Sequence, residues 1–336
     1  MHRRCLVLFS GGLDSILACK VLQKQNIDVV AVKFISPFFS YELKDEDTSK
    51  EYIKNIGHKY GIDVLVADIS DEYLKMVVNP PHGYGKYLNP CIDCKILMIK
   101  KAISMLEDYS ASFVATGEVL GQRPMSQRRD TLRIIERDSG GEGILLRPLS
   151  ATHFKETIPE KHGIVDREKL PRIAGRSRKI QIKLAEEFNI LDYPSPAGGC
   201  ILTDPILSSR FKKIFNKWPN FTINDCILAQ VGRHFLLPKG SWLVVGRNKS
   251  ENQKLKQLVT QNDISLKAQN IPGPFSIVRY LQSEEDLKLA SNILIRYTKG
   301  KSLSSKVELE RKSNGLKKVL DVDFIPSDIE IHSLMF

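Results

Sequence analysis

Long hydrophobic runs are missing from this sequence of 336 residues. No apolar stretch approaches the roughly 20 residues that a helix needs to cross a bilayer. The first four residues, two of them arginines, lead directly into a short apolar run and do not have the pattern of a signal peptide. We therefore expect neither a leader nor a membrane anchor, and we expect the protein to be cytoplasmic.

Cysteine is scarce as well, with six residues in the whole chain. In a cytoplasmic protein, cysteines are more often reduced, catalytic or metal-bound than paired in disulfides. Three of them lie in apolar stretches and are predicted to be core residues: Cys5, Cys19 and Cys226. The other three remain as candidates for chemistry: Cys91, Cys94 and Cys200.

Acidic residues are fewer than basic residues in the C-terminal part of the chain. From residue 206 onward, 21 Lys and Arg stand against 12 Asp and Glu, which gives +9 of the formal net charge of +11. Such an excess of positive charge favours a polyanionic partner. The sequence has no long internal repeat and no low-complexity segment.

The pattern of apolar runs predicts two domains. Up to residue 205, continuous apolar runs typical of strands alternate with segments that have the apolar spacing of helices. This order is typical of an α/β domain with a doubly wound, mostly parallel sheet. We expect its strands at 5–9, 28–34, 62–69, 112–116 and 144–148, and helices at 16–24, 45–60 and 91–106. Residues 206–336 predict a smaller α+β domain. We expect its strands at 235–237, 242–245, 275–280 and 293–297, and helices at 251–260 and 284–292.

A glycine turn joins the first predicted strand to the first helix, with the sequence Ser10-Gly11-Gly12-Leu13-Asp14-Ser15. Glycines let the backbone approach a ligand, and serine hydroxyls and helix N-terminal amides point at an anion. A carboxylate at Asp14 fits a phosphate site if it helps to hold Mg²⁺. The turn is not a Walker loop, because no Gly-Lys-Ser or Gly-Lys-Thr follows, and the glycine spacing excludes a Rossmann fingerprint. The plainer alternative is a glycine-rich turn capped by serines.

This turn resembles the pyrophosphatase loop of the PP-loop ATP pyrophosphatases, an adenine nucleotide alpha-hydrolase-like fold. The resemblance implies that ATP is cleaved between its α- and β-phosphates with Mg²⁺, that Asp14 is catalytic, and that a carbonyl oxygen or carboxylate is adenylated. It also implies a set of ATP-binding residues on the loop, the second strand and the fourth strand. They are Ser10, Gly11, Gly12, Asp14, Ser15, Val32, Lys33, Phe34, Thr116, Gly117 and Gln122.

The three remaining cysteines form a second motif. Cys91 and Cys94 lie one turn apart at a predicted helix N-terminus, whose dipole is expected to lower the thiol pKa. Cys200 ends a turn at 194–200 with the sequence Pro-Ser-Pro-Ala-Gly-Gly-Cys. Three thiolates can hold a 4Fe-4S cluster by three of its irons and leave the fourth iron open. The alternatives are a persulfide and disulfide relay between Cys94 and Cys200, and zinc binding or plain core packing. Zinc is disfavoured because no fourth ligand accompanies Cys200.

Two further motifs narrow the resemblance. Residues 116–122, Thr-Gly-Glu-Val-Leu-Gly-Gln, followed by Ser126-Gln127, look like the tRNA 4-thiouridine synthetase family, although residues 123–125 differ from it. Residues 89–94 together with Cys200 resemble the iron-sulfur dependent tRNA thiolases. The resemblance implies an ATP-dependent tRNA sulfurtransferase that makes thiouridine with sulfur from sulfide or from a donor protein such as a cysteine desulfurase. Two alternatives stay open: an iron-sulfur dependent desulfurase of thiolated nucleobases or small sulfur compounds, and a non-enzymatic RNA-binding protein.

Basic residues in two segments are candidates for RNA contacts. The strip at 167–183 is either an RNA path or a solvated helix face. Residues 231–235 and 245–252 are similar to the NFACT-type RNA-binding domain. We name Arg172, Arg176, Arg178, Lys179, Arg233 and Arg247 as RNA-binding candidates. We expect the nearby aromatics to be exposed for base stacking, with core packing as the alternative: Trp218, Phe235, Trp242 and Tyr280.

Overall fold

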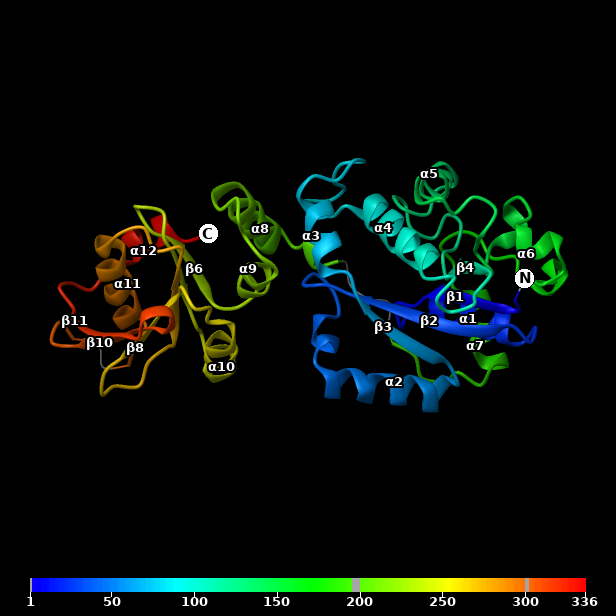
Figure 1. Cartoon of the computed structure of the whole chain (residues 1–336). Helices are drawn as coiled ribbons and strands as arrows, with labels where there is room; N and C mark the ends of the chain where they lie inside the picture. The colour runs from blue at the N-terminus through cyan, green and yellow to red at the C-terminus, as the bar shows by residue number, and fades with distance from the viewer. Residues whose placement is uncertain (1, 195–199, 300–301) are drawn as a thin grey trace. The chain divides into compact units, whose positions relative to one another are not determined.

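The computed structural model describes residues 2–194, 200–299 and 302–336. The chain divides into two compact units, Met1–Pro205 and Ile206–Phe336, which are coloured blue to green and green to red in Figure 1. Within the described residues, no helix is long and apolar enough to cross a membrane. The roles assigned to residues 1–205 and 206–336 stay predictions.

A parallel sheet forms the centre of the first unit and confirms the predicted α/β fold. Its described strands form one five-stranded sheet in the order β3-β2-β1-β4-β5. The strand order reverses at β1, whose last residue Leu8 pairs with Val32 of β2 and with Thr116 of β4. Ligands bind at such switch points, outside the carboxyl ends of the strands. The bounds are β1 Arg4–Leu8, β2 Asp28–Ile35, β3 Asp63–Asp68, β4 Phe113–Thr116 and β5 Leu145–Leu146.

Helices cover both faces of this sheet. Figure 1 shows α4 and α5 over one face, with α2 and α7 on the other. Alternate residues of β1, Cys5 and Val7, share one core with α1 and α7, and Cys19 of α1 is fully buried in that core. The prediction of a core role for Cys5 and Cys19 is therefore confirmed. The bounds are α1 Leu13–Gln23, α2 Glu46–Tyr60, α3 Ser70–Val78, α4 Cys91–Ser104, α5 Arg129–Ser139, α6 Ile158–Lys161 and α7 Lys179–Glu187.

Local chemistry fixes the ends of α2 close to their predicted places. The Asp45 carboxylate accepts a hydrogen bond from the Thr48 amide at 2.9 Å, which satisfies an N-terminal amide that would otherwise lack a partner. The helix ends at Gly61, whose φ of +61° belongs to the left-handed region that glycine adopts at little cost.

The helices α3 and α5 were not predicted.

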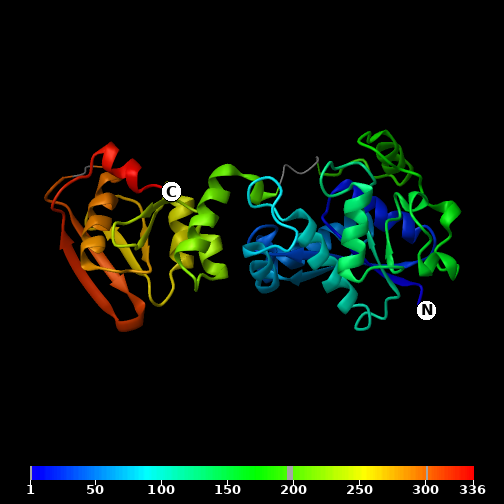
Figure 2. The same cartoon turned by 90° about the horizontal axis from the view of Figure 1, so that it is seen from above.

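The second unit is an antiparallel sheet with helices, which confirms the α+β prediction. Its described strands form a six-stranded sheet in the order β11-β10-β8-β9-β7-β6. The edge hairpin of β10 and β11 is drawn in orange-red in Figure 2. The strands are β6 Arg233–Leu236, β7 Trp242–Val245, β8 Ile264–Ala268, β9 Ser276–Arg279, β10 Lys306–Arg311 and β11 Leu316–Asp321. The helices are α8 Pro205–Lys217, α9 Ile223–Leu228, α10 Lys249–Leu258, α11 Glu284–Arg296 and α12 Asp328–Leu334.

The predicted strand at 293–297 is wrong. Its residues form the end of α11, where Ile293, Leu294 and Ile295 are all buried against the sheet. A short run of consecutive apolar residues fits a buried strand and a buried helix equally well, so its spacing could not distinguish the two.

The predicted exposure of the aromatic residues is also wrong for most of them. Phe235 and Trp242 are fully buried, and Trp218 is only 7% exposed. The Trp218 ring stacks on Trp242 at 5.3 Å and on the half-buried Tyr280 at 5.2 Å between centroids. These rings pack in the core of the second unit and are not free to stack on bases.

A buried ion cluster holds the same core together. Arg279 of β9 pairs with Asp225 of α9 and with Asp263 before β8, each at 2.7 Å. Its guanidinium also donates to the Leu258 carbonyl at 2.9 Å. Breaking a buried pair is strongly destabilising because the remaining charges stay buried without a partner.

We predict that Arg279→Met destabilises the second unit by about 3–5 kcal/mol. The control is Arg247→Met, because Arg247 forms an exposed pair with Glu251, and such pairs contribute about 0–1 kcal/mol. Urea unfolding followed by tryptophan fluorescence reports on this unit, since both tryptophans of the chain lie in it. Equal shifts of the two variants would contradict the importance of the buried cluster.

Candidate functional site

The glycine loop leaves β1 and enters α1 at the carboxyl edge of the parallel sheet. Gly11 has a φ of +83°, which a residue with a side chain rarely adopts. Inside the loop, the Gly12 amide donates to Ser10 Oγ at 3.2 Å and Ser15 Oγ donates to the Gly12 carbonyl at 2.7 Å. The loop is thereby held beside the first amides of α1, which have no partner within the helix and are available to an anion.

The end of β4 touches this loop because it carries a glycine. A Cβ on Gly117 would lie 2.6 Å from the backbone of Asp14, which is closer than real atoms come. Gly117 therefore allows the segment after Thr116 to run directly beside the loop.

Two cavities flank the loop, and together they contain every predicted ATP-binding residue. The first, of about 440 Å³, is lined by Ser10, Asp14, Ser15, Val32, Lys33, Phe34, Thr116 and Gly117. The second, of about 550 Å³, is lined by Ser10, Gly11, Gly12, Asp14, Lys33 and Gln122. Cys91 lies in the wall of the first cavity, so the glycine loop and one cysteine of the second motif share a cavity.

The Asp14 carboxylate already has partners from distant parts of the chain. It accepts a hydrogen bond from Gln122 Nε2 at 2.8 Å and lies 3.5 Å from Arg178 Nη2. Gln181 in turn donates to Gln122 at 3.1 Å. These contacts hold the carboxylate in place beside the loop.

The RNA candidates of the first unit lie in different surroundings. Arg176 and Arg178 line the second cavity at the loop, so Arg178 lies beside Asp14 and not on an outer surface. Arg172 is exposed and pairs with Glu168 at 3.4 Å. Lys179 begins α7 and is exposed.

Sequence reasoning missed Tyr52 of α2. Its hydroxyl is buried, has no hydrogen-bond partner among the described residues, and would lie 3.1 Å from a Cβ on Gly11. Burial raises the pKa of Tyr52 to about 12, so the hydroxyl keeps its proton. Lys33 lies over the Tyr52 ring and donates to the Ser10 carbonyl at 2.9 Å. The helical spacing predicted the helix at 45–60, but nothing in the sequence placed Tyr52 at the loop.

A buried ion network beside the first cavity was also missed. Glu118 forms ion pairs with Lys95 and, at 3.2 Å, with Arg147, whose side chain is only 2% exposed. Arg147 also pairs with Glu136 at 2.8 Å. Burial acts to raise the pKa of Glu118, but Lys95 and Arg147 outweigh it and hold that pKa below its ordinary value. Glu118 is therefore an anion that positions Lys95 in the cavity wall.

The structure brings the three candidate cysteines into one neighbourhood. Cys91 and Cys94 lie in the first turn of α4, and a charge on either Cys91 or Cys200 acts on the Cys94 thiol. The Tyr73 hydroxyl acts to lower the pKa of the Cys94 thiol. The part of the predicted turn at residues 195–199 lies outside the described residues.

The expected lowering of the Cys94 pKa is wrong. Burial raises the pKa of Cys94 to about 12 and also raises that of Cys200. Burial removes hydration free energy from a thiolate, and the helix dipole restores only about 0.3–1 kcal/mol of it. The loss of hydration therefore outweighs the dipole. A bound metal would remove this penalty, because a coordinating thiol is deprotonated by the metal charge.

The donor set of this neighbourhood fits an iron-sulfur cluster. Among the described residues, no three His, Cys, Asp or Glu side chains are close enough to hold a single metal ion. A cluster with several irons takes a separate thiolate on each iron, so its ligands need not meet at one point. Three neighbouring thiols that are partly shielded from solvent satisfy that requirement.

The RNA candidates of the second unit make contacts within that unit. The guanidinium of Arg233 lies 4.6 Å from the centre of the Tyr297 ring. Arg247 donates to the Glu251 carboxylate through its Nε at 2.8 Å. Cys226 is fully buried, which confirms its predicted core role.

Similarity to known families follows the same division of the chain. Residues 1–163 match the family described as thiamine biosynthesis protein (ThiI), and residues 232–333 match the NFACT protein RNA binding domain. These matches confirm both resemblances predicted from the sequence motifs.

Curated relatives include two kinds of tRNA-modifying enzyme. The chain is 26% identical over 127 residues to tRNA-specific 2-thiouridylase MnmA of Clostridium acetobutylicum, covering 35% of this chain and 36% of the relative. It is 27% identical over 172 residues to a probable tRNA sulfurtransferase of Thermococcus kodakarensis, covering 50% and 43%. The chain thus spans well under half the length of these two relatives. At the level of families, these two relatives are tRNA thiolation enzymes.

The solved structures to which the chain shows similarity include two thiolation proteins. One is a 4-thiouridine synthetase in complex with RNA and bound ATP, with 22% identity, a TM-score of 0.35, and coverage of 56% of this chain and 52% of that chain. Another is the U34-tRNA thiolase NcsA of Methanococcus maripaludis with its [4Fe-4S] cluster, with 16% identity, a TM-score of 0.32, and coverage of 68% and 71%.

We predict that ATP protects Cys91 from alkylation in protein purified in air. Cys91 lines the cavity at the loop, whereas Cys5, Cys19 and Cys226 are fully buried. Iodoacetamide labelling followed by peptide mass spectrometry should show Cys91 modified several times faster than the buried three, and this difference should shrink with ATP. Equal labelling with and without ATP would place the nucleotide elsewhere.

Proposed function

We propose that this protein is an ATP-dependent tRNA sulfurtransferase that adenylates a carbonyl oxygen of a uridine and replaces that oxygen with sulfur. The observation that carries this proposal is the shared cavity of about 440 Å³, whose wall contains both the glycine loop and Cys91. A carbonyl carbon of a pyrimidine is a poor electrophile. Activation of its oxygen and attack by sulfur must therefore occur at one place.

The first step uses the residues of the loop. The Ser10–Ser15 loop and the amides at the start of α1 bind the phosphates of ATP, and the adenine lies against the backbone at 32–34. Asp14 is positioned to hold Mg²⁺, whose charge offsets that of the phosphate oxygens. The uridine oxygen attacks the α-phosphorus, the bond to the β-phosphate oxygen breaks, and pyrophosphate leaves. The unpaired Tyr52 hydroxyl and Lys33 supply donors on the Gly11 side of the loop.

The second step uses the cysteines. Sulfur attacks the activated carbon, and AMP leaves with the former uridine oxygen. In our preferred form of the proposal, Cys91, Cys94 and Cys200 would hold a 4Fe-4S cluster, which would supply a binding site for sulfide. In the other form, a persulfide delivers the sulfur and leaves a disulfide between Cys94 and Cys200, which a thiol reductant must then reopen.

The second unit is proposed to supply tRNA affinity. It carries +9 of the formal net charge of +11 and matches the NFACT RNA-binding domain over residues 232–333. Lys and Arg neutralise phosphates and release counterions, so this affinity should depend steeply on salt. The proposed chemistry needs reduced thiols and a sulfur donor, either sulfide or a protein such as a cysteine desulfurase, and we propose a cytoplasmic location for it.

We predict that Asp14→Asn lowers the rate of tRNA-dependent AMP and pyrophosphate formation by about 100-fold or more, because losing a metal ligand removes several kcal/mol of transition-state stabilisation. The control is Asp45→Asn, which keeps a capping side chain at the start of α2. The readout is AMP release measured by chromatography. Parent-like AMP release by the Asp14 variant would contradict the assignment of the loop.

We predict that Cys91→Ala, Cys94→Ala and Cys200→Ala each remove thiolated nucleoside from the tRNA product and leave AMP formation within about threefold of the parent rate. Anaerobically purified parent protein should be brown, and these variants should be colourless. Cys226→Ala is the control, because Cys226 lies in the core of the other unit. The readouts are the visible spectrum and mass spectrometry of tRNA nucleosides.

The same measurements separate the alternatives. A colourless anaerobic parent that still thiolates tRNA favours the persulfide relay. A brown parent that removes sulfur from thiolated substrates without forming AMP is a desulfurase, and tRNA binding with neither reaction indicates an RNA-binding protein.

A further inference from the structure

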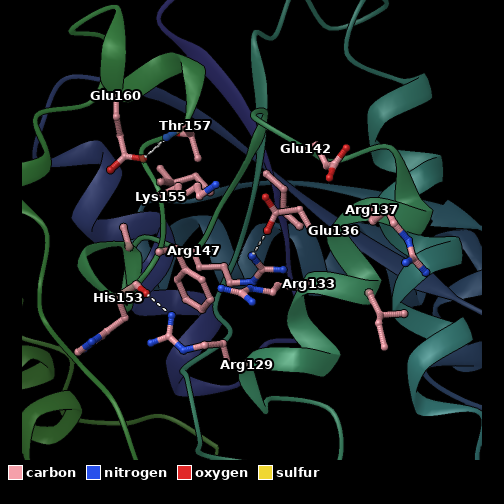
Figure 3. A pocket seen from close by; sticks show the side chains of 15 residues that line it. Arg129, Arg133, Glu136, Arg137, Glu142, Arg147, His153, Lys155, Thr157 and Glu160 are labelled. Atoms are coloured by element: carbon pink, nitrogen blue, oxygen red, sulfur yellow. Dashed lines mark hydrogen bonds and ion pairs between the residues drawn. The ribbon is translucent and has the colours of Figure 1, made fainter.

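A third cavity of the first unit shares no lining residue with the two at the glycine loop. It has a volume of about 670 Å³ and lies between α5 and the segment that follows β5, residues 146–160. Figure 3 shows Arg129 and Arg133 of α5 close to Arg147, which follows β5. The guanidinium groups of Arg129 and Arg147 lie 5.7 and 5.2 Å from the centre of the Phe154 ring. Neither the motifs nor the proposed chemistry accounts for this cavity.

The charge of the cavity comes from the spacing of arginines on α5. Arg129, Arg133 and Arg137 follow one another at four-residue intervals, so they share one face of the helix, while Leu132 and Ile135 bury the other. Like charges at this spacing disfavour a helix by about 0.2–0.5 kcal/mol per pair. A bound anion would reverse that cost.

Most acidic groups in the wall are already neutralised. Glu136 pairs with Arg147 at 2.8 Å. Glu160 pairs with Arg167 at 2.6 Å and also accepts a hydrogen bond from the Thr157 amide. Only the exposed Glu142 has no such partner among the described residues.

Three cations of the wall have no ion-pair partner among the described residues: Arg129, Arg133 and Lys155. Within the described residues, the side chains of Arg133 and Lys155 form no hydrogen bond or ion pair. Arg129 uses one nitrogen to donate to the His153 carbonyl at 2.8 Å and lies 5.7 Å from the centre of the Phe154 ring. Its remaining donors, with those of Arg133 and Lys155, are available to an anion inside the cavity.

We propose that this cavity binds a phosphate group of the sugar–phosphate backbone of the RNA substrate, through Arg133 and Lys155 with Arg129 beside them. The inference rests on the proposed function and adds a contact site for its substrate. Arginine forks match phosphate oxygens, and phosphate contacts fix the register of a nucleic acid on a protein. A volume of about 670 Å³ is far larger than one free phosphate needs and leaves room for the adjoining sugars.

The wall of this cavity is joined to the cavity at the loop through buried charges. Arg147 lines the third cavity, and its partner Glu118 lines the first cavity together with Lys95 and Cys91. A backbone phosphate held at Arg133 is therefore fixed relative to the side chains that surround the reaction. This gives the first unit a role in RNA register that is distinct from the affinity of the second unit.

The test is the double variant Arg133→Gln/Lys155→Gln in the full chain. Fluorescence anisotropy with labelled tRNA over a range of salt should show weaker binding, and the slope of log affinity against log salt should fall by about 0.7–0.9, for one lost phosphate contact. The matched control is Arg128→Gln/Lys161→Gln, which removes the same charge from exposed positions that do not line the cavity. The control should keep the parent slope to within about half a unit.

Other outcomes overturn the inference or separate it from the proposed function. Unchanged tRNA affinity and slope in the double variant, with inorganic phosphate binding lost in calorimetry, would make this a site for a free anion and not for RNA. Equal losses of tRNA affinity in both double variants would show that the effect comes from net charge and not from this cavity. A parent protein that binds tRNA but makes no thiolated nucleoside would overturn the proposed function, whereas the slope measurement would still decide the role of the cavity.

Discussion

The end of β4 lies so close to the glycine loop that a Cβ on Gly117 would sit 2.6 Å from the backbone of Asp14. This approach decides what can reach the loop. The residues after Gly117 place Glu118 against Lys95 and bring Gln122 to the Asp14 carboxylate. Arg147, and through it the wall of the third cavity, is tied to the same segment by Glu118. An alanine at 117 would push β4 and the loop apart and displace all of these contacts.

The parallel sheet and the loop could be predicted because their signals are local in the sequence. Continuous apolar runs are typical of strands buried on both faces, and glycine and serine between a strand and a helix indicate an anion site. The run at 293–297 is equally apolar but belongs to α11. Apolar composition alone, without a helical or strand spacing, therefore could not distinguish a strand from a helix. The β10–β11 hairpin was missed because its outward residues are mostly charged.

Burial and pairing could not be predicted, because the partners are far apart in the sequence. Arg279 pairs with Asp225, which lies 54 positions away in the sequence. Arg178 looked like part of a basic strip, and it reaches Asp14 across 164 positions. The same reason explains the wrong prediction for the Cys94 pKa. The sequence indicated the helix N-terminus, which lowers a thiol pKa, but not the burial that raises it.

The contact between Asp14 and Arg178 makes cation binding at this carboxylate an exchange. The carboxylate is not bare before a divalent ion arrives, because Arg178 Nη2 already lies 3.5 Å from it and Gln122 donates to it. A divalent ion that binds Asp14 has to displace the guanidinium, and its binding free energy is reduced by the free energy of that contact. Arg178 would then act toward the ion as a proton acts toward a chelator: it competes for the carboxylate and sets the ion concentration at which the site fills.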